Sequence, residues 1–364
     1  MGAHGRRAGL TRVPPAAAAA LLCATAVSAC SPVYVLKAGW AEAKILSARE
    51  PIPAVAADSA TDAELRGKLA LVLEARRFAA DTLGLRVGDS YTTYTRLERD
   101  TLALVLSAAH KDRLEARTWW FPIVGRVPYR AYFSESDARA AEAELRGEGF
   151  DTYLRPTAAF STLGWFSDPL LSTVVGQDHV GLVETVLHEI AHTHLFVPGR
   201  VQFNESYATF VGHAASAAFF CRRRGGGPDT VWCRRARDRW ADVQDFSRFL
   251  DRVVADLTAV YGDPGLTREE KLVRREEIFD GAKRRFRAEL RPVLRAYGFG
   301  YFLRTPLNNA TLLARMRYYH RLPEFGTLLA SQDGDLAATI AFLADHAGEA
   351  EDPFDLLDGS DPGG

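Results

Sequence analysis

The sequence predicts an α+β fold, with a small mixed sheet followed by a mostly helical half. Short runs rich in aromatic and β-branched residues, separated by Gly, Pro and Asp, occur between residues 90 and 166, and such runs are typical of strands. After Gly176 the apolar residues recur at helical spacing almost to the end of the chain. With 364 residues, of which 47% are hydrophobic, the chain is long enough to bury one sizeable core. A net charge of −1 gives no reason to expect nucleic acid as a partner.

The individual elements follow from local patterns. A helix is expected from Thr61 to Leu85, because its apolar residues lie three and four positions apart. The charged segment 134–150 is typical of an amphipathic helix, opened by a Ser cap and closed by Gly. Strands are expected at 90–97, 102–109, 117–123, 130–133, 151–156 and 157–166. Further helices are expected at 180–195, 204–222, 229–261, 267–297, 306–322 and 333–347.

The first 29 residues have the pattern of an export signal. Three arginines without an acid precede an Ala-rich apolar run that stops at Cys30, as in secretory signals. The segment Val27–Cys30 resembles the lipobox of bacterial lipoproteins, in which the cysteine becomes the acylated first residue, and Ser31 resembles the outer-membrane sorting pattern. A plain signal peptide is the alternative. We expect an exported protein, anchored to the membrane of the bacterial envelope, on its periplasmic side, by a lipid on Cys30.

The remainder of the chain is expected to form one folded unit. The expected parts are a signal peptide at 1–29, an anchor or linker at 30–58, the folded unit at 59–356 and a disordered tail at 357–364. Within the unit, residues 59–178 contain the sheet and residues 179–356 the helices. Cys221 and Cys233 flank a Gly-rich loop, so they are a candidate disulfide in an exported protein, with two free buried thiols as the alternative.

The segment TVLHEIAHTHLF, at 185–196, contains the pattern HExxH. On a helix, His188 and His192 project from the same face, so both can reach one Zn²⁺ ion. Glu189 then stands where a general base accepts a proton from water that the metal activates. The apolar neighbours predict a buried helix, and buried polar groups need a partner such as a metal. The alternative is a surface helix with these side chains in water.

A catalytic zinc site needs a third protein ligand. Glu205 is the best candidate, because it lies in the first turn of the next expected helix, after a Pro-Gly turn. His213, eight residues later on a similar face, is the rival, whereas His194 lies on nearly the opposite face of its helix. Glu184, one turn before His188, could orient a ligand histidine or face solvent.

Four segments together resemble the bacterial predicted aminopeptidase family, a group of zinc peptidases of the glutamate type. They are TWWFPIVGRVPYRAYF, AFSTLGWFSDPLLST, VLHEIAHTHLF with FNESYATFVG, and LNNATLLARMRYYHRLPEF. The resemblance spans about Trp119 to Phe325 and implies a zincin-like fold, a peptide substrate and one catalytic zinc. It implies His188, His192 and Glu205 as the zinc ligands and Glu189 as the base. The twelve residues between His192 and Glu205 are fewer than is usual in the broader glutamate-type peptidases.

Three further residues are candidates for the reaction. Tyr318 and Tyr319 could donate a hydrogen bond to the oxyanion of the tetrahedral intermediate, although tyrosines on an amphipathic helix also serve as core. Gly164 lies just before the metal helix, where an edge strand could align an extended substrate; an ordinary sheet strand is the alternative.

The sequence therefore predicts a lipid-anchored, zinc-dependent peptidase. The residues support hydrolysis of peptide bonds, and the family resemblance supports an aminopeptidase. Two alternatives remain open: an endopeptidase with the same metal site, and a non-catalytic envelope lipoprotein with a structural zinc. The structural alternative requires a fourth protein ligand, such as His213, and makes Glu189 dispensable.

Overall fold

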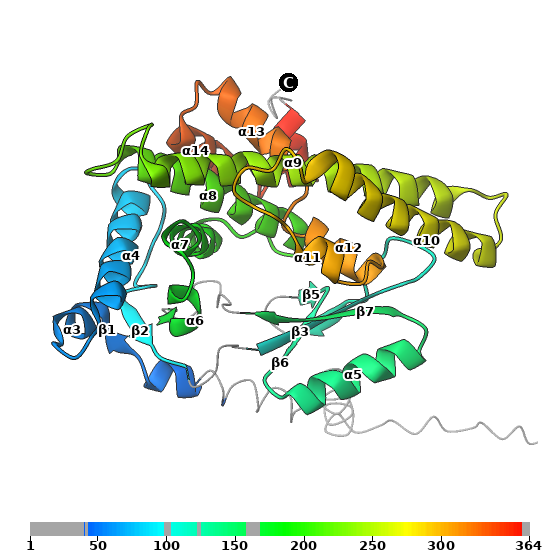
Figure 1. Ribbon diagram of the computed structural model, residues 1–364, viewed down its shortest axis with the longest axis horizontal. Helices are drawn as coiled ribbons and strands as arrows, with labels where there is room; N and C mark the ends of the chain where they lie inside the picture. Colours follow the sequence, from blue (N-terminus) through cyan, green and yellow to red (C-terminus); the bar gives the residue numbers. More distant parts are fainter. Residues whose placement is uncertain (1–39, 41–42, 98–102, 122–124, 158–167, 359–364) are drawn as a thin grey trace, which may run out of the picture.

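The computed structural model describes residue 40 and residues 43–97, 103–121, 125–157 and 168–358. The expected lipidation site, Cys30, and the candidate substrate residue, Gly164, lie outside the described residues. Figure 1 shows a mixed α+β protein in which long helices of the second half lie along one side of small sheets. No helix in the described ranges is long and apolar enough to cross a membrane.

The described strands form three small sheets, where the sequence suggested one. The first sheet has the order β1 (Glu50–Pro51), β2 (Thr93–Thr95) and β8 (Leu170–Leu171), with β1 antiparallel and β8 parallel to β2. The second places β3 (Ala103–Ala109) between β6 (Arg130–Tyr132) and β7 (Asp151–Thr157), both antiparallel to it. The third pairs β4 (Trp119–Phe121) with β5 (Gly125–Val127).

Strand β3 is buried because helices cover both faces of its sheet. Helix α5 (Glu135–Gly147) packs on one face and α12 (Asn309–Met316) on the other (Figure 1). Six of the seven residues of β3 are therefore buried, which explains its continuous apolar run. Helix α5 begins as predicted at a Ser cap, where the Ser134 hydroxyl accepts a hydrogen bond from the Asp137 amide.

The expected linker at 30–58 contains part of the fold. Glu50 pairs with Tyr94 across β1 and β2, and Ile52, the first residue of α3 (Ile52–Ala57), is fully buried. A two-residue strand has no periodicity of its own, so its pairing cannot be read from the sequence. At the other end, a 3₁₀ helix, Pro353–Asp358, continues past the predicted boundary at 356, and Leu357 is only 5% exposed.

Helix α7 (His179–His194) lies at the centre of the helical half. It contacts α4 (Ala63–Asp81), α8 (Val201–Arg222) and α9 (Val231–Gly262), and Figure 1 shows it enclosed between them. Ten of its sixteen residues are buried, as the surrounding apolar residues predicted. A disulfide joins Cys221 to Cys233, with Cα atoms 4.7 Å apart, and closes the loop between α8 and α9.

The remaining helices of the described structure depart from the predicted ones, because two are shorter and three were not expected. Beyond the four-residue α6 (Ser172–Val175), they are α10 (Arg268–Arg285), a π-helix at Phe286–Leu290, α11 (Tyr301–Arg304), α13 (Leu322–Ser331) and α14 (Leu336–His346). The helix expected to reach 297 ends early because Pro292 has no amide hydrogen and clashes with the preceding turn. The buried carboxylate of Asp242 accepts the amides of residues 295–297 instead.

Candidate metal centre

Two consecutive helices bring His188, His192 and Glu205 together. The Nε2 atoms of His188 and His192 lie 3.4 and 3.5 Å from Oε2 of Glu205. One potential ligand atom from each residue lies within 4.8 Å of the others, and no fourth His, Cys, Asp or Glu joins them among the described residues. Two imidazole nitrogens and one carboxylate oxygen are a donor set that suits a divalent zinc ion.

The two histidines owe their placement to the local geometry of α7. Asp178 caps the helix by accepting a hydrogen bond of 2.8 Å from the Gly181 amide. The four-residue spacing then places the rings of His188 and His192 on one face, with centroids 4.9 Å apart. The Nδ1 atom of His192 is buried without a hydrogen-bond partner in the described structure. The polar neighbours of this ring therefore lie on its Nε2 side.

Glu205 is positioned by the residue before it. The Asn204 side chain donates to the Val197 carbonyl at 2.8 Å and accepts from the Val197 amide at 2.9 Å. These two bonds fasten the turn between α7 and α8, so the start of α8 is held against the end of α7. Because α8 begins at Val201, Glu205 lies in the second turn of the helix, and not in the first turn as predicted.

The close approach of α7 and α8 depends on Gly212. A Cβ atom at this position would lie 2.8 Å from the Glu184 carbonyl oxygen and 3.1 Å from Cβ of His188. Both neighbours belong to α7, one to its backbone, so a larger residue would push the helices apart. The glycine was not singled out from the sequence, although the run of small residues around it in VGHAASAA is a signal of close helix packing.

The electrostatics of the triad favour a carboxylate facing two basic rings. Burial acts to raise the pKa of Glu205, but hydrogen bonding and the charges of His188 and His192 outweigh it and hold that pKa well below its usual range. Burial likewise acts to lower the pKa of His192, and the bond to Glu205 outweighs this too, so the pKa is raised. In the absence of a metal, a proton can therefore take the place of a cation between the ring nitrogens and the carboxylate.

Glu189 lies in a more acidic environment than the sequence indicated. Burial raises its pKa, and the charges of Glu205 and Asp168 raise it further, against the lowering effect of the two histidines. Tyr91 belongs to the same neighbourhood: burial raises its pKa, and Glu189 and Asp168 raise it further.

Tyr91 is also a backbone exception, with φ of 62°. Its amide donates to the Asp168 carbonyl at 2.8 Å, so this left-handed conformation is held by a contact between two segments far apart in sequence. Strained residues cluster at functional sites. No sequence pattern distinguishes Tyr91 from its strand-like neighbours, so sequence reasoning could not find it.

The two adjacent tyrosines diverge. The ring of Tyr318 stacks on His188, with centroids 6.2 Å apart and planes 30° apart, and its hydroxyl accepts a hydrogen bond from Arg155 at 3.2 Å. Tyr319 instead packs edge-on against Phe246, at 5.1 Å, inside the aromatic core. The expectation that both line the site is therefore corrected, because both follow the end of α12 at Met316 and their side chains point to different neighbours.

His213 and Glu184 form a separate cluster about one turn of α7 before His188. His213 Nδ1 lies 3.0 Å from Glu184 Oε1, and Arg239 donates to Glu184 Oε2 at 2.8 Å. Tyr297 donates to the same oxygen at 2.9 Å. His213 is thus committed to a carboxylate away from the triad, and Glu184 orients no ligand histidine. His194 also points elsewhere, since its Nδ1 accepts the amide of Arg86 at 3.1 Å.

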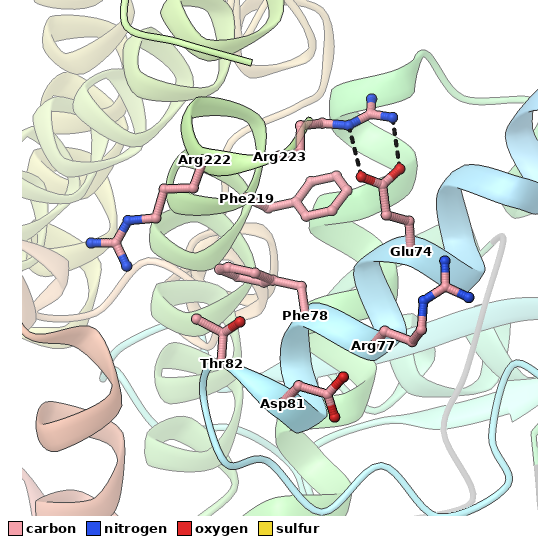
Figure 2. A pocket seen from close by; sticks show the side chains of 8 residues that line it. All are labelled: Glu74, Arg77, Phe78, Asp81, Thr82, Phe219, Arg222 and Arg223. Carbon is pink, nitrogen blue, oxygen red and sulfur yellow. Dashed lines mark hydrogen bonds and ion pairs between the residues drawn. The ribbon is translucent and has the colours of Figure 1, made fainter. Parts of the chain in front are cut away.

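A surface hollow between the C-terminal parts of α4 and α8 contains none of these residues (Figure 2). Its wall is formed by an ion pair of 2.7 Å between Arg223 and Glu74, and by Phe78 packed edge-on against Phe219. Nothing in its composition indicates a reactive group, so it is not part of the candidate centre.

The fold and the centre define an α+β protein whose two central helices carry a group of two histidines and one carboxylate. Residues 33–351 match the family described as "Putative aminopeptidase", and the chain belongs to this family. The family resemblance found in the sequence is confirmed, and its name implies a peptidase. Comparisons with curated proteins and with solved structures give no match. The matched range includes the whole triad.

Proposed function

We propose that this protein is a zinc-dependent peptidase of the zincin type and, by its family, an aminopeptidase. The observation that carries the proposal is the convergence of two imidazole nitrogens and a carboxylate oxygen within 4.8 Å, beside Glu189 on the same helix. His188, His192 and Glu205 would hold the zinc ion. When bound, zinc supplies a Lewis acid that polarises the scissile carbonyl and lowers the pKa of a water molecule toward about 7.

Three protein ligands favour a catalytic over a structural zinc. Structural sites close the tetrahedron with four side chains, whereas catalytic sites leave one position for water or substrate. The residue expected to close a structural site, His213, lies against Glu184 at 3.0 Å. Within the described structure no other side chain replaces it. This supports a site that is open to a reacting group.

Glu189 serves as the proton carrier in this proposal. Its carboxylate takes a proton from the attacking water and passes it to the nitrogen of the leaving amine. Burial raises its pKa, and this favours a group that holds the proton between the two steps. The backbone of α7 fixes Glu189 beside the first ligand, so both act on the same substrate carbonyl.

In this proposal Tyr318 donates a hydrogen bond to the developing oxyanion. Its hydroxyl oxygen accepts a hydrogen bond from Nη2 of Arg155 at 3.2 Å, so its own hydrogen remains available for a donor role. Its ring lies over His188, so the side chain stands next to one of the proposed metal ligands. A donor aimed at the oxyanion typically raises kcat by a factor of about 10²–10³.

The test is hydrolysis of a peptide library by the zinc-loaded full-length protein, beside the same library with acetylated N-termini. Cleavage of free-amine peptides alone, lost in Glu189→Gln, is the expected result for an aminopeptidase. Equal cleavage of both libraries would make the protein an endopeptidase with the same centre. Tight binding of one zinc per chain without any cleavage would favour the structural alternative.

We also propose that the protein is exported and acylated at Cys30. The disulfide between Cys221 and Cys233 supports this location, because such bonds persist in oxidising compartments. The test is metabolic labelling with radioactive palmitate in a bacterial host. Label should enter the wild-type protein and be absent from Cys30→Ser, and an unlabelled wild-type protein would contradict the proposal.

A further inference from the structure

We propose that Arg155 and Arg317 form a subsite for a carboxylate group of the substrate, beside the metal centre. The inference rests on the proposed peptidase function and adds the substrate class: peptides that carry a carboxylate just beyond the scissile bond. This carboxylate is either the C-terminus of a short peptide or an acidic side chain. The case stands on the position of the two guanidinium groups and on their lack of a protein anion.

Arg155 contacts Tyr318, the candidate oxyanion donor. It projects from β7, and its Nη2 donates to the Tyr318 hydroxyl at 3.2 Å, with its Cζ atom 5.8 Å from the centre of the Tyr318 ring. Since this ring stacks on His188 at 6.2 Å, the positive charge stands one side chain away from the triad. The Arg155 side chain is partly exposed, so a ligand can reach it.

Arg317 is the second arginine of the proposed subsite. It is 3% exposed, its Nη2 donates to Ser107 at 3.1 Å, and its guanidinium lies 4.7 Å from the centre of the Tyr129 ring. Its Nε is buried without a hydrogen-bond partner among the described residues. Burial, the largest influence, lowers its pKa, and the neighbouring charge of Arg155 lowers it further, while Glu205 acts in the opposite direction. Geometry places the two arginines together. Arg155 on β7 pairs with Val105 of β3, and Ser107, which holds Arg317, lies two residues further along β3 on the same face. Tyr318, the next residue after Arg317, contacts His188 of the triad.

Two other buried arginines in the described structure are neutralised by carboxylates. Arg239 pairs with Glu184 at 2.8 Å and Arg275 with Asp151 at 2.9 Å. In the part of the chain that the structure describes, no carboxylate lies within 4.0 Å of Arg155 or Arg317. Uncompensated buried charge is costly, so the buried Arg317 beside the partly exposed Arg155 favours an anion that the protein itself does not provide.

Arg315 also lacks an acidic partner, but it belongs to a different environment. Its guanidinium lies 5.1 Å from the Tyr301 ring and 5.3 Å from the Phe302 ring, inside the aromatic core that also holds Tyr319. Arg315 is therefore not part of the subsite.

The position of the subsite limits the length of the substrate. An extended residue spans about 3.3–3.6 Å, so a carboxylate held beside Tyr318 lies within about two residues of the carbonyl at the metal centre. A guanidinium pairs with a carboxylate through two parallel hydrogen bonds, which adds orientation as well as energy. We therefore infer that dipeptides, tripeptides and peptides with an acidic residue near the cleaved bond are the preferred substrates.

Binding is the first test, because it does not depend on turnover. The full-length Glu189→Gln protein is titrated calorimetrically with Ala-Ala-Ala, with its C-terminal amide, and with amidated Ala-Asp-Ala. The free acid should bind about 10- to 100-fold more tightly than the amide, as expected for charged hydrogen bonds. If the aspartyl peptide regains this affinity, the subsite also takes side chains; if it binds like the amide, the subsite is restricted to the C-terminus.

The matched variants are Arg155→Gln and Arg155→Lys, with Arg139→Gln, an exposed arginine paired with Glu135, as the control. Arg155→Gln should bring the ratio of acid to amide affinity close to one, and Arg155→Lys should leave an intermediate ratio because the charge remains. The control should keep the wild-type ratio. Thermal melting shows whether each variant is folded. If a variant does not fold, the acid and amide affinities of the protein with Arg155 unchanged still test the subsite.

The subsite and the proposed function can fail separately. Equal affinity for acids and amides in the Glu189→Gln protein would overturn the subsite, even if the wild-type enzyme cleaves both. A clear preference for acids without any hydrolysis by the wild-type protein would support the subsite and remove the peptidase proposal. In an active enzyme, amidation should raise KM with little change in kcat, because the contact lies outside the reacting bond.

Discussion

Helix α7 carries two polar clusters, and they differ in how their charges are balanced. The first contains Glu184, whose two oxygens accept from His213 and Arg239 at 3.0 and 2.8 Å. The second contains His188, His192 and Glu205, whose closest polar contacts are 3.4 and 3.5 Å long. Both clusters are largely buried, and both contain a histidine beside a glutamate from the neighbouring helix.

The comparison shows that two buried His–Glu pairs on one helix can differ in role: one is a structural ion pair, and the other is a candidate metal site. In the cluster of Glu184, an arginine and a carboxylate neutralise each other at hydrogen-bond distance, which is the arrangement of a structural ion pair. In the triad, one potential ligand atom of each residue lies near the other two. The contacts of 3.4 and 3.5 Å between the rings and Glu205 are longer than ordinary hydrogen bonds, so they do not by themselves compensate for burying these groups. The first cluster is complete without a ligand, whereas the second gains most from a shared cation.

The largest expected effect is on zinc binding, and it distinguishes His192 of the triad from His213 of the other cluster. His192→Ala should weaken zinc binding by more than about 100-fold, since even residues that only orient a ligand contribute 10- to 100-fold, and activity should be lost with the metal. His213→Ala should keep one zinc per chain. Zinc content after dialysis, measured by elemental mass spectrometry, checks both. Equal loss of zinc in His213→Ala would show that the two clusters are one metal site.

The next effect concerns stability. Glu184→Ala removes one carboxylate from the buried Arg239, which keeps its ion pair with Asp178 at 2.6 Å. Breaking a buried pair costs about 3–5 kcal/mol, and the remaining pair places the expected loss at the lower end of this range. Glu205→Gln in the metal-free protein should cost clearly less, because the imidazoles opposite it can remain neutral. Urea unfolding of the two metal-free variants gives the comparison. A larger loss in Glu205→Gln would mean that the triad, and not the cluster of Glu184, supports the fold.

Removal of metal should affect one cluster alone. A ligand that binds only the folded state stabilises it by RT ln(1 + [L]/Kd), which is about 2.7 kcal/mol when free zinc is about 100 times Kd. A chelator should therefore lower the melting temperature of the wild-type protein and of His213→Ala. It should leave the melting temperature of Glu205→Ala unchanged, and an equal shift in that variant would place the stabilising ion elsewhere.

The smallest expected effect links the two clusters. Gly212→Ala would bring a methyl group 2.8 Å from the Glu184 carbonyl and 3.1 Å from Cβ of His188. Overpacking of this kind costs about 1–3 kcal/mol, and the shift of α8 should also weaken zinc binding. Gly67→Ala, in a helix with no atom within 4 Å of the new methyl group, is the matched control and should be neutral or stabilising. Wild-type zinc affinity in Gly212→Ala would show that α8 moves without carrying Glu205 along.

Local patterns predicted the elements that carry the site. The HExxH helix was expected at 180–195 and spans His179–His194, with Asp178 as its cap. The next helix was expected from residue 204 and begins at Val201. These elements have long apolar periods and clear caps, so short-range propensity and burial act in the same direction. The adjacent tyrosines show the limit of such patterns. Both Tyr318 and Tyr319 follow the end of α12 at Met316, where helical spacing no longer predicts which way a side chain points.

Spacing within one helix was enough to place His188 and His192 on one face, because helical geometry depends only on neighbouring residues. The sequence also favoured Glu205 over His213 as the third member of the group, but only the packing of α8 on α7 brings it to the two rings. The pairing of His213 with Glu184 and the approach of Arg155 to Tyr318 were decided by tertiary structure alone. Each of these contacts joins residues from different elements, with sequence separations of 29 for His213 and 163 for Arg155. Such contacts depend on how whole helices and strands pack, and no local pattern of residues contains that information.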